Sequence, residues 1–183
     1  PALATEILTT TGHHLRERSP QRQPLTEGRF EKVSMAGRPG FDASLLLSAG
    51  EPGFGFEHGE VYSVHVGWSG NSVLSAERQP YTTGLIGGGE VLLGGEATLA
   101  RGETYTTPWL YGSYGDGLNE VAARFHDYVR SCHPDLAVKP RPVILNTWEA
   151  VYFDHDYDTL KALADKAGDS GVCLLYTSDA ADE

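Results

Sequence analysis

The sequence of 183 residues lacks the features that mark several large classes of protein. Its 14 Lys and Arg residues are outnumbered by 25 Asp and Glu residues, which gives a formal net charge of −11. The Lys and Arg residues form no cluster, and this argues against a nucleic-acid partner because phosphate contacts need a basic face. No apolar run approaches the ~18 residues of a membrane-spanning helix, so we expect no membrane partner.

Cysteine and methionine are also scarce. Cys132 and Cys173 lie in unlike contexts and indicate no disulfide framework. This usage is compatible with a reducing compartment and favours a cytoplasmic location. The chain begins at Pro1 and its one methionine is Met35, so we expect it to be part of a longer protein. A signal peptide further upstream therefore stays an open alternative.

Three short patterns approach known motifs, and each fails at a defined position. Gly67-Trp68-Ser69-Gly70-Asn71 carries Asn in place of the second Gly of a nucleophile elbow, and it joins two β segments. The glycine-rich stretch 84–95 lacks the Gly-Lys-Ser/Thr end of a phosphate-binding loop, and we expect it to form a tight hairpin or bulge. The pair His13-His14 has no spaced acidic or cysteine partner and is expected on the surface.

The densest acidic run, residues 154–158, suggests a metal site but fits one poorly. A calcium loop needs Gly at its sixth position and Glu at its twelfth, where this chain has Thr159 and Asp165. Carboxylates at the start of a helix are the simpler interpretation, because they suit the helix dipole. We therefore assign no metal, no cofactor and no catalytic residue to this chain.

Residues 1–115 are predicted to form a β-sandwich. Turn signals recur every 8–12 residues or so between short segments rich in β-branched and aromatic residues. The residues Tyr62, Val64, Val66 and Trp68 share one face of a strand by their alternation. The expected strands are 41–49, 61–68, a returning strand at 73–77 after a turn at 69–71, then 90–100 and 104–109.

A helical pattern replaces the β pattern at Asp116. One apolar stripe recurs at helical spacing, and Asp116-Gly117 suits the helix start while Pro134 ends it. The connector Lys139-Pro140-Arg141-Pro142 cannot be helical throughout. Residues 116–142 are therefore predicted to be a linker helix with a proline-rich connector. The stripe consists of Leu118, Val121, Ala122, Phe125, Tyr128 and Val129.

Residues 143–172 are predicted to be the first βα unit of a truncated (β/α)₈ barrel. The apolar run 143–147 is typical of a strand that is buried on both faces. Asp158 is expected to cap a helix that carries Leu160 and Leu163 and ends at Gly168. One such unit cannot close a barrel of eight. The fold class is therefore mainly β, with a large β-sandwich first, a linker helix and the start of the barrel.

Asn146-Thr147-Trp148-Glu149 follows the predicted barrel strand, at the end where barrels arrange their chemistry. Trp148 could stack on the apolar side of a sugar ring, while Asn146 and Glu149 could bind hydroxyls. The alternative is that Trp148 is a core residue under the sandwich.

Three stretches of the chain resemble bacterial α-galactosidases of glycoside hydrolase family 36. Residues 141–154, Arg-Pro-Val-Ile-Leu-Asn-Thr-Trp-Glu-Ala-Val-Tyr-Phe-Asp, are similar to the entry into that family's catalytic barrel. Residues 66–71 resemble a strand and turn of its sandwich, and residues 106–126 resemble the strand and helix before the barrel. The likeness runs from about Thr11 to Val172. It implies hydrolysis of terminal non-reducing α-D-galactose from oligosaccharides, with retention of configuration.

The resemblance also implies where the chemistry is located. Retaining enzymes use two carboxyl groups, one as nucleophile and one as acid then base. In this family both are aspartates on later barrel strands, so this chain has no catalytic residue and is expected to be inactive alone. Trp148 is the one residue that carries over as a substrate-binding residue. The implied partner is an α-galactoside oligosaccharide, and the parent enzyme is implied to be a homo-oligomer.

Two other functions stay open. One is a non-catalytic β-sandwich that binds carbohydrate or protein, and the other is a transglycosylating relative of the raffinose-synthase type. The final segment raises a separate question. Residues 173–183, Cys-Leu-Leu-Tyr-Thr-Ser-Asp-Ala-Ala-Asp-Glu, resemble a translated sequencing adapter, so we expect the genuine chain to end near Val172.

Overall fold

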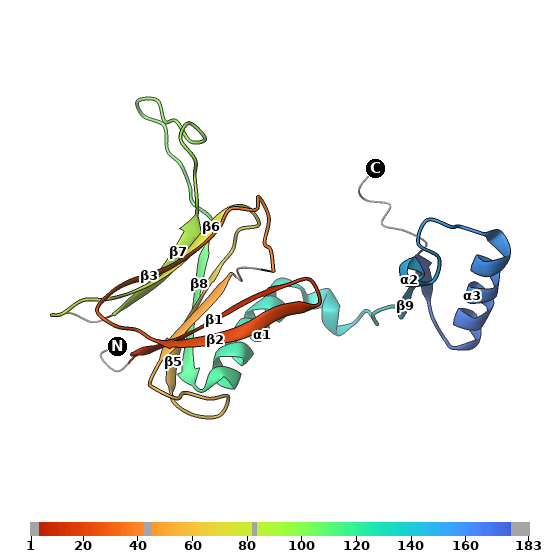
Figure 1. Cartoon of the computed structure of the whole chain (residues 1–183), viewed down its shortest axis with the longest axis horizontal. Coiled ribbons are helices and arrows are strands. Elements are labelled where there is room, and N and C mark those ends of the chain that lie inside the picture. Colours follow the sequence, from red (N-terminus) through yellow and green to blue (C-terminus); the bar gives the residue numbers. More distant parts are fainter. Residues whose placement is uncertain (1–3, 42–44, 82–83, 177–183) are drawn as a thin grey trace. The chain divides into compact units, whose positions relative to one another are not determined.

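The computed structural model describes residues 4–41, 45–81 and 84–176, which fall into two compact units, Pro1–Val129 and Arg130–Glu183 (Figure 1). The first unit holds the β-rich part of the chain, and the second holds a short strand–helix–strand segment. The elements of the first unit are β1 (Glu6–His13), β2 (Arg16–Pro24), β3 (Gly28–Ser34), β4 (Leu46–Gly50), β5 (Glu60–Val66), β6 (Ser72–Arg78), β7 (Leu85–Glu90), β8 (Leu110–Asp116) and most of α1 (Leu118–Cys132).

Two antiparallel sheets pack face to face in the first unit. The larger has the strand order β2-β1-β4-β5-β8, and the smaller has the order β3-β6-β7. Apolar side chains from both sheets fill the space between them and are at most 9% exposed. The predicted sandwich is therefore confirmed. This core consists of Ala4, Ile7, Leu25, Leu47, Ala49, Val64, Val66, Leu74 and Ala76.

Helix α1 covers the other face of the larger sheet. Val121 of the helix packs with Phe54 and Val61 in a second buried cluster, and Leu8, Leu118 and Phe125 border it. Strand β5 is consequently buried on both faces, whereas its alternating pattern predicts one apolar face only. The covered second face includes Ser63, whose hydroxyl lies 2.6 Å from that of Ser48.

The segment after β5 joins the two sheets. The sequence predicts a returning strand after the turn at 69–71, and a strand does begin at Ser72. However, β6 pairs with β3 and β7 of the smaller sheet and not with β5. Trp68 lies outside β5 and is 40% exposed, so the turn is a corner of the sandwich and not a hairpin.

The expected strands at 90–100 and 104–109 are wrong. The glycine run itself forms part of strand β7, and the last strand of the first unit is β8 at residues 110–116. Gly88 shows why glycine is needed inside β7. A Cβ atom there would lie 2.6 Å from the carbonyl oxygen of Val73 and 2.8 Å from Cγ2 of Val66. The neighbouring strand β6 and the Val66 side chain of the facing sheet together leave no room for a side chain at this position.

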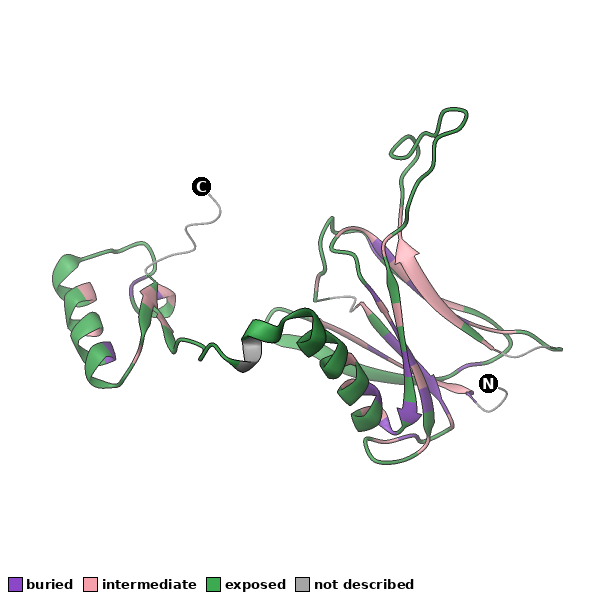
Figure 2. Ribbon diagram, turned by 180° about the vertical axis from the view of Figure 1, so that it is seen from behind, coloured by how far each residue is buried: buried purple, intermediate pink, exposed green. Residues whose placement is uncertain are grey.

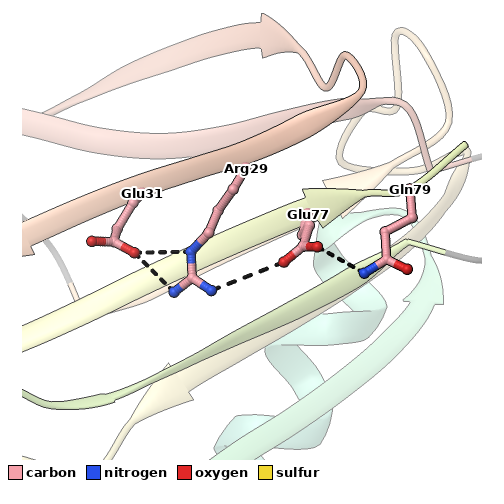
Figure 3. Close-up of polar contacts among 4 residues, drawn as sticks. All are labelled: Arg29, Glu31, Glu77 and Gln79. Atoms are coloured by element: carbon pink, nitrogen blue, oxygen red, sulfur yellow. Dashed lines mark hydrogen bonds and ion pairs between the residues drawn. The ribbon is translucent and has the colours of Figure 1, made fainter.

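The outer face of the smaller sheet carries a chain of polar contacts between β3 and β6 (Figure 3). Arg29 donates to Glu31 at 2.9 Å and lies 3.9 Å from Glu77, which accepts a 2.8 Å hydrogen bond from Gln79. These side chains are partly exposed, so each ion pair contributes at most about 1 kcal/mol. They make this face a solvated surface.

The second unit contains η1 (Pro134–Ala137), β9 (Ile144–Asn146), α2 (Trp148–Val151), α3 (Tyr157–Asp169) and β10 (Leu174–Tyr176). Strands β9 and β10 pair in parallel, as the first two strands of a barrel do. The predicted strand is present, and its apolar side chains are largely exposed in this chain: Val143 is 58% exposed and Ile144 53%. Figure 2 shows how little of this unit is buried compared with the sheets.

Strand β10 falls within the segment that the sequence assigns to an adapter. Residues 174–176 pair with β9, and residues 177–183 lie outside the described residues. The adapter origin of residues 173–183 stays a prediction.

Alanine at Gly88 should disturb the contact between the sheets. We expect Gly88→Ala to lower the free energy of unfolding by about 1–3 kcal/mol, as overpacking does. The matched control is Gly89→Ala, where an added Cβ meets nothing within 4 Å. Urea unfolding measures both variants, and equal midpoints for the two would contradict the close approach.

Candidate functional site

The residues after β9 form the candidate site. The backbone N–H of Trp148 donates to Oδ1 of Asn146 at 2.7 Å, which fixes the start of α2. Thr147 is 1% exposed, and both its N–H and its hydroxyl donate to the carbonyl oxygen of Tyr176, at 2.9 and 3.0 Å. Trp148 is therefore anchored at the carboxyl end of the paired strands.

Two aromatic rings contact the Trp148 indole within this unit. The ring of Phe153 lies 4.9 Å from it, centroid to centroid, at 87°, and the ring of Tyr152 lies 5.6 Å from it at 76°. Both contacts are edge-to-face, a favourable geometry for aromatic pairs. Trp148 is half-buried. Both interpretations of Trp148, as a sugar contact and as a core residue under the sandwich, stay predictions.

Glu149 and Tyr152 form a hydrogen-bonded pair beside the indole. The Tyr152 hydroxyl donates to Oε2 of Glu149 at 3.0 Å, and this bond raises the pKa of Tyr152 above its ordinary value. The sequence suggests Asn146 and Glu149 as ligands for sugar hydroxyls. In the structure, Oδ1 of Asn146 and Oε2 of Glu149 instead accept hydrogen bonds from Trp148 and Tyr152.

Tyr152 and Phe153 are functional candidates that the sequence pattern does not select. The signal for Tyr152 is its spacing, because it lies four residues after Trp148, where side chains on a helix meet. Phe153 offers no comparable signal. Its contact depends on the backbone at Tyr152, which has φ 47° and ψ −116° and turns the chain back towards the indole.

The acidic run 154–158 begins helix α3. Asp156 is the N-cap, and its carboxylate accepts the N–H of Thr159 at 2.8 Å. The prediction that Asp158 caps this helix is therefore wrong. Asp156 has the extended backbone of a cap residue, whereas Asp158 lies in the first turn. Among the described residues, no three His, Cys, Asp or Glu side chains gather as a metal site would require.

Neither the histidine pair nor the sandwich cleft forms a second candidate site among the described residues. His13 and His14 are exposed, as expected. A cleft of about 280 Å³ lies in the sandwich, with the Tyr62 and Tyr114 rings stacked 6.4 Å apart in its lining. Its remaining lining is apolar or backbone apart from Ser63 and Ser113, and the Tyr62 hydroxyl already donates to Glu60 at 2.5 Å. Such a cleft offers few partners for sugar hydroxyls.

Two family models match consecutive parts of the chain. The glycosyl hydrolase family 36 N-terminal domain matches residues 1–100, and melibiase matches residues 104–180. The first match alone covers more than half of the residues. The chain belongs to glycoside hydrolase family 36.

Relatives within family 36 resemble the chain in sequence and in structure. An α-galactosidase of Escherichia coli is 36% identical over 180 residues, which are 96% of this chain and 25% of the relative. The α-galactosidase of Lactobacillus brevis has a TM-score of 0.85 at 26% identity, over 96% of this chain and 24% of its own. A variant of α-galactosidase AgaA from Geobacillus stearothermophilus, solved with raffinose, has a TM-score of 0.84 at 25% identity, over 98% and 25%.

The chain spans about a quarter of the length of these family 36 relatives and is homologous to their N-terminal region. No helix within the described residues is long and apolar enough to cross a membrane.

The Asp156 cap gives a test of how α3 is held. Its bond to Thr159 lowers the pKa of Asp156, so the stabilisation of α3 is present above the unfolded pKa and is lost as pH falls through the folded one. We expect Asp156→Ala to speed hydrogen exchange of the α3 amides at pH 7. Asp156→Asn should keep the cap and remove its acid dependence.

The matched control is Asp158→Ala, which removes a carboxylate from the first turn but no side-chain cap. Faster hydrogen exchange of the α3 amides in this variant than in Asp156→Ala would show that Asp158 is the cap and would contradict the prediction.

Proposed function

We propose that this chain is the sandwich and barrel entry of an α-galactosidase that removes terminal non-reducing α-D-galactose from oligosaccharides. The observation that carries the proposal is the order of the matched parts. The family 36 N-terminal domain is followed directly by the start of the melibiase match, and within that match Trp148 follows β9, the first strand of the proposed barrel. The E. coli and L. brevis relatives carry the name α-galactosidase.

The proposed chemistry is a retaining mechanism with two carboxyl groups. Such groups lie about 5–5.5 Å apart, one attacking the sugar and the other protonating the leaving oxygen and then activating water. We propose that both lie on barrel strands beyond this chain, so the chain alone is inactive. A homo-oligomeric parent enzyme and a cytoplasmic location belong to the same proposal.

Trp148 is the proposed substrate contact of the chain. An indole presents a broad apolar face to the C–H side of a galactose ring, and its place after β9 corresponds to the end of a barrel where substrates bind. The raffinose complex of the G. stearothermophilus enzyme supports an oligosaccharide as the class of substrate.

The decisive experiment compares this chain with a product extended along the source DNA beyond codon 172. We expect the 183-residue chain to release no nitrophenol from p-nitrophenyl α-galactoside and the extended product to release it steadily. Release by the short chain would refute the absence of catalytic carboxyl groups. A folded extended product that cleaves no α-galactoside would refute the function itself.

Trp148 is tested in the extended product. We expect Trp148→Ala to lower kcat/KM for α-galactosides at least about tenfold, which corresponds to ~1.4 kcal/mol of transition-state binding. The control is Trp109→Ala, which removes an indole that is 76% exposed in the other unit. Equal losses in both variants would remove Trp148 from the substrate site.

A non-catalytic, carbohydrate-binding sandwich is the second candidate, and the stacked pair Tyr62–Tyr114 is the one observation that favours it. Such a protein would bind galactosides on the sandwich and gain no hydrolysis on extension. Transfer of galactose to another sugar instead of water would mark a transglycosylase.

A further inference from the structure

We propose that Phe153 and the Glu149–Tyr152 pair are positioning residues, which hold the Trp148 indole in the orientation that the sugar contact requires. This inference rests on the proposed function, because it assigns a role to the neighbours of the proposed substrate contact. It goes beyond that function by naming the side chains that fix the indole.

The geometry of the two ring contacts favours a positioning role. The Phe153 and Tyr152 rings meet the indole at 87° and 76°, with centroids 4.9 and 5.6 Å away. Neither ring lies parallel to the indole, so neither makes the parallel stacking contact that a sugar ring would make. Two nearly perpendicular contacts restrict rotation of the indole about its side-chain bonds, because either rotation would drive it into a neighbouring ring.

The backbone of Tyr152 also favours a positioning role. Its φ of 47° with ψ of −116° lies in a region that favours glycine. A tyrosine persists there only where the surroundings over-determine it, and such strain is concentrated at functional sites. Here the backbone N–H donates to the Trp148 carbonyl at 2.8 Å, and the hydroxyl donates to Glu149 at 3.0 Å. Both bonds hold the turn that carries Phe153 to the indole.

Burial within this chain does not explain the contacts of Phe153 and Tyr152 with the indole. Phe153 is 86% exposed and Tyr152 51%, whereas their neighbour Val151 is 7% exposed and packs into the unit. A ring as exposed as Phe153 gains little from the hydrophobic effect. Its described ring contact is with Trp148, so its placement is better explained by that contact than by a core.

The experiment follows Trp148 directly in the full 183-residue chain labelled with 5-fluorotryptophan. The chain has three tryptophans, and Trp148→Phe identifies the ¹⁹F signal of interest. We expect Phe153→Leu and Glu149→Ala each to shift or broaden the Trp148 signal. Glu149→Gln should restore the original signal, since its amide oxygen can still accept the Tyr152 hydroxyl.

The matched control is Tyr157→Leu, which removes an exposed aromatic ring from the start of α3. It should leave the Trp148 signal unchanged. Tyr152→Phe removes only the hydroxyl, so it should also shift or broaden the Trp148 signal, and it decides the proposal if the larger changes unfold the unit. An unchanged Trp148 signal in Phe153→Leu, Glu149→Ala and Tyr152→Phe would overturn the proposal.

A kinetic arm separates positioning from stability in the extended product. If Phe153 positions the indole, Phe153→Leu should raise KM about tenfold and leave kcat nearly unchanged, because ground-state and transition-state binding weaken together. A purely structural role would lower the active fraction, and therefore kcat, at constant KM, and that result would overturn the proposal. Absence of any hydrolysis would instead count against the proposed function, while the ¹⁹F signals would still decide the positioning.

Discussion

Strand β5 must be buried on both faces, and the rest of the first unit is arranged to meet this constraint. The smaller sheet covers Val64 and Val66 on one side, and α1 covers Val61 on the other. Burial of apolar surface is the dominant favourable contribution to folding. The chain therefore has to cross from one sheet to the other between β5 and β6 and then return for β8, which pairs with β5 on its free side.

Small residues occur where these three layers approach most closely. Gly88 lies where β7 meets β6 and β5 with no room for a Cβ atom. On the helix side, a Cβ at Gly115 would lie 2.8 Å from that of Glu120, and the Ser113 hydroxyl donates to the Val121 carbonyl at 3.1 Å. Close approach thus explains the glycines at 88 in β7 and 115 in β8.

The close approach of the layers also limits which elements can be predicted from the sequence. Helix α1 was predictable, because its apolar stripe and its Asp116-Gly117 start are local signals. Strands β7 and β8 were not, because glycine weakens the strand signal and its reason lies in the facing layer. Likewise, β9 was predictable as a strand from its apolar run, but its burial depends on neighbours that pair with it in space.

The candidate site likewise contains one residue that could be predicted from the sequence and one that could not. Trp148 could be selected from its place after a strand, whereas Phe153 could not, because its contact arises from a backbone conformation that tyrosine rarely adopts. The motifs that failed at one position, such as the elbow at 67–71, brought no catalytic group into position. Position relative to an element proved more informative here than residue type alone.

The second unit holds one parallel pair of barrel strands, and this limits what it can contribute to a barrel enzyme. Glycoside cleavage depends on two carboxyl groups held at a fixed separation, and that separation is set by strands that pair around a closed barrel. A single parallel pair such as β9 and β10 fixes the direction of one loop but not the distance across a barrel. What it can supply is orientation: Thr147 is bonded to the neighbouring strand, and Trp148 follows it at once. The proposed contribution of this part of the chain to catalysis is thus to orient the sugar. Orientation lowers the entropic part of the activation barrier and leaves the bond-breaking part to the carboxyl groups.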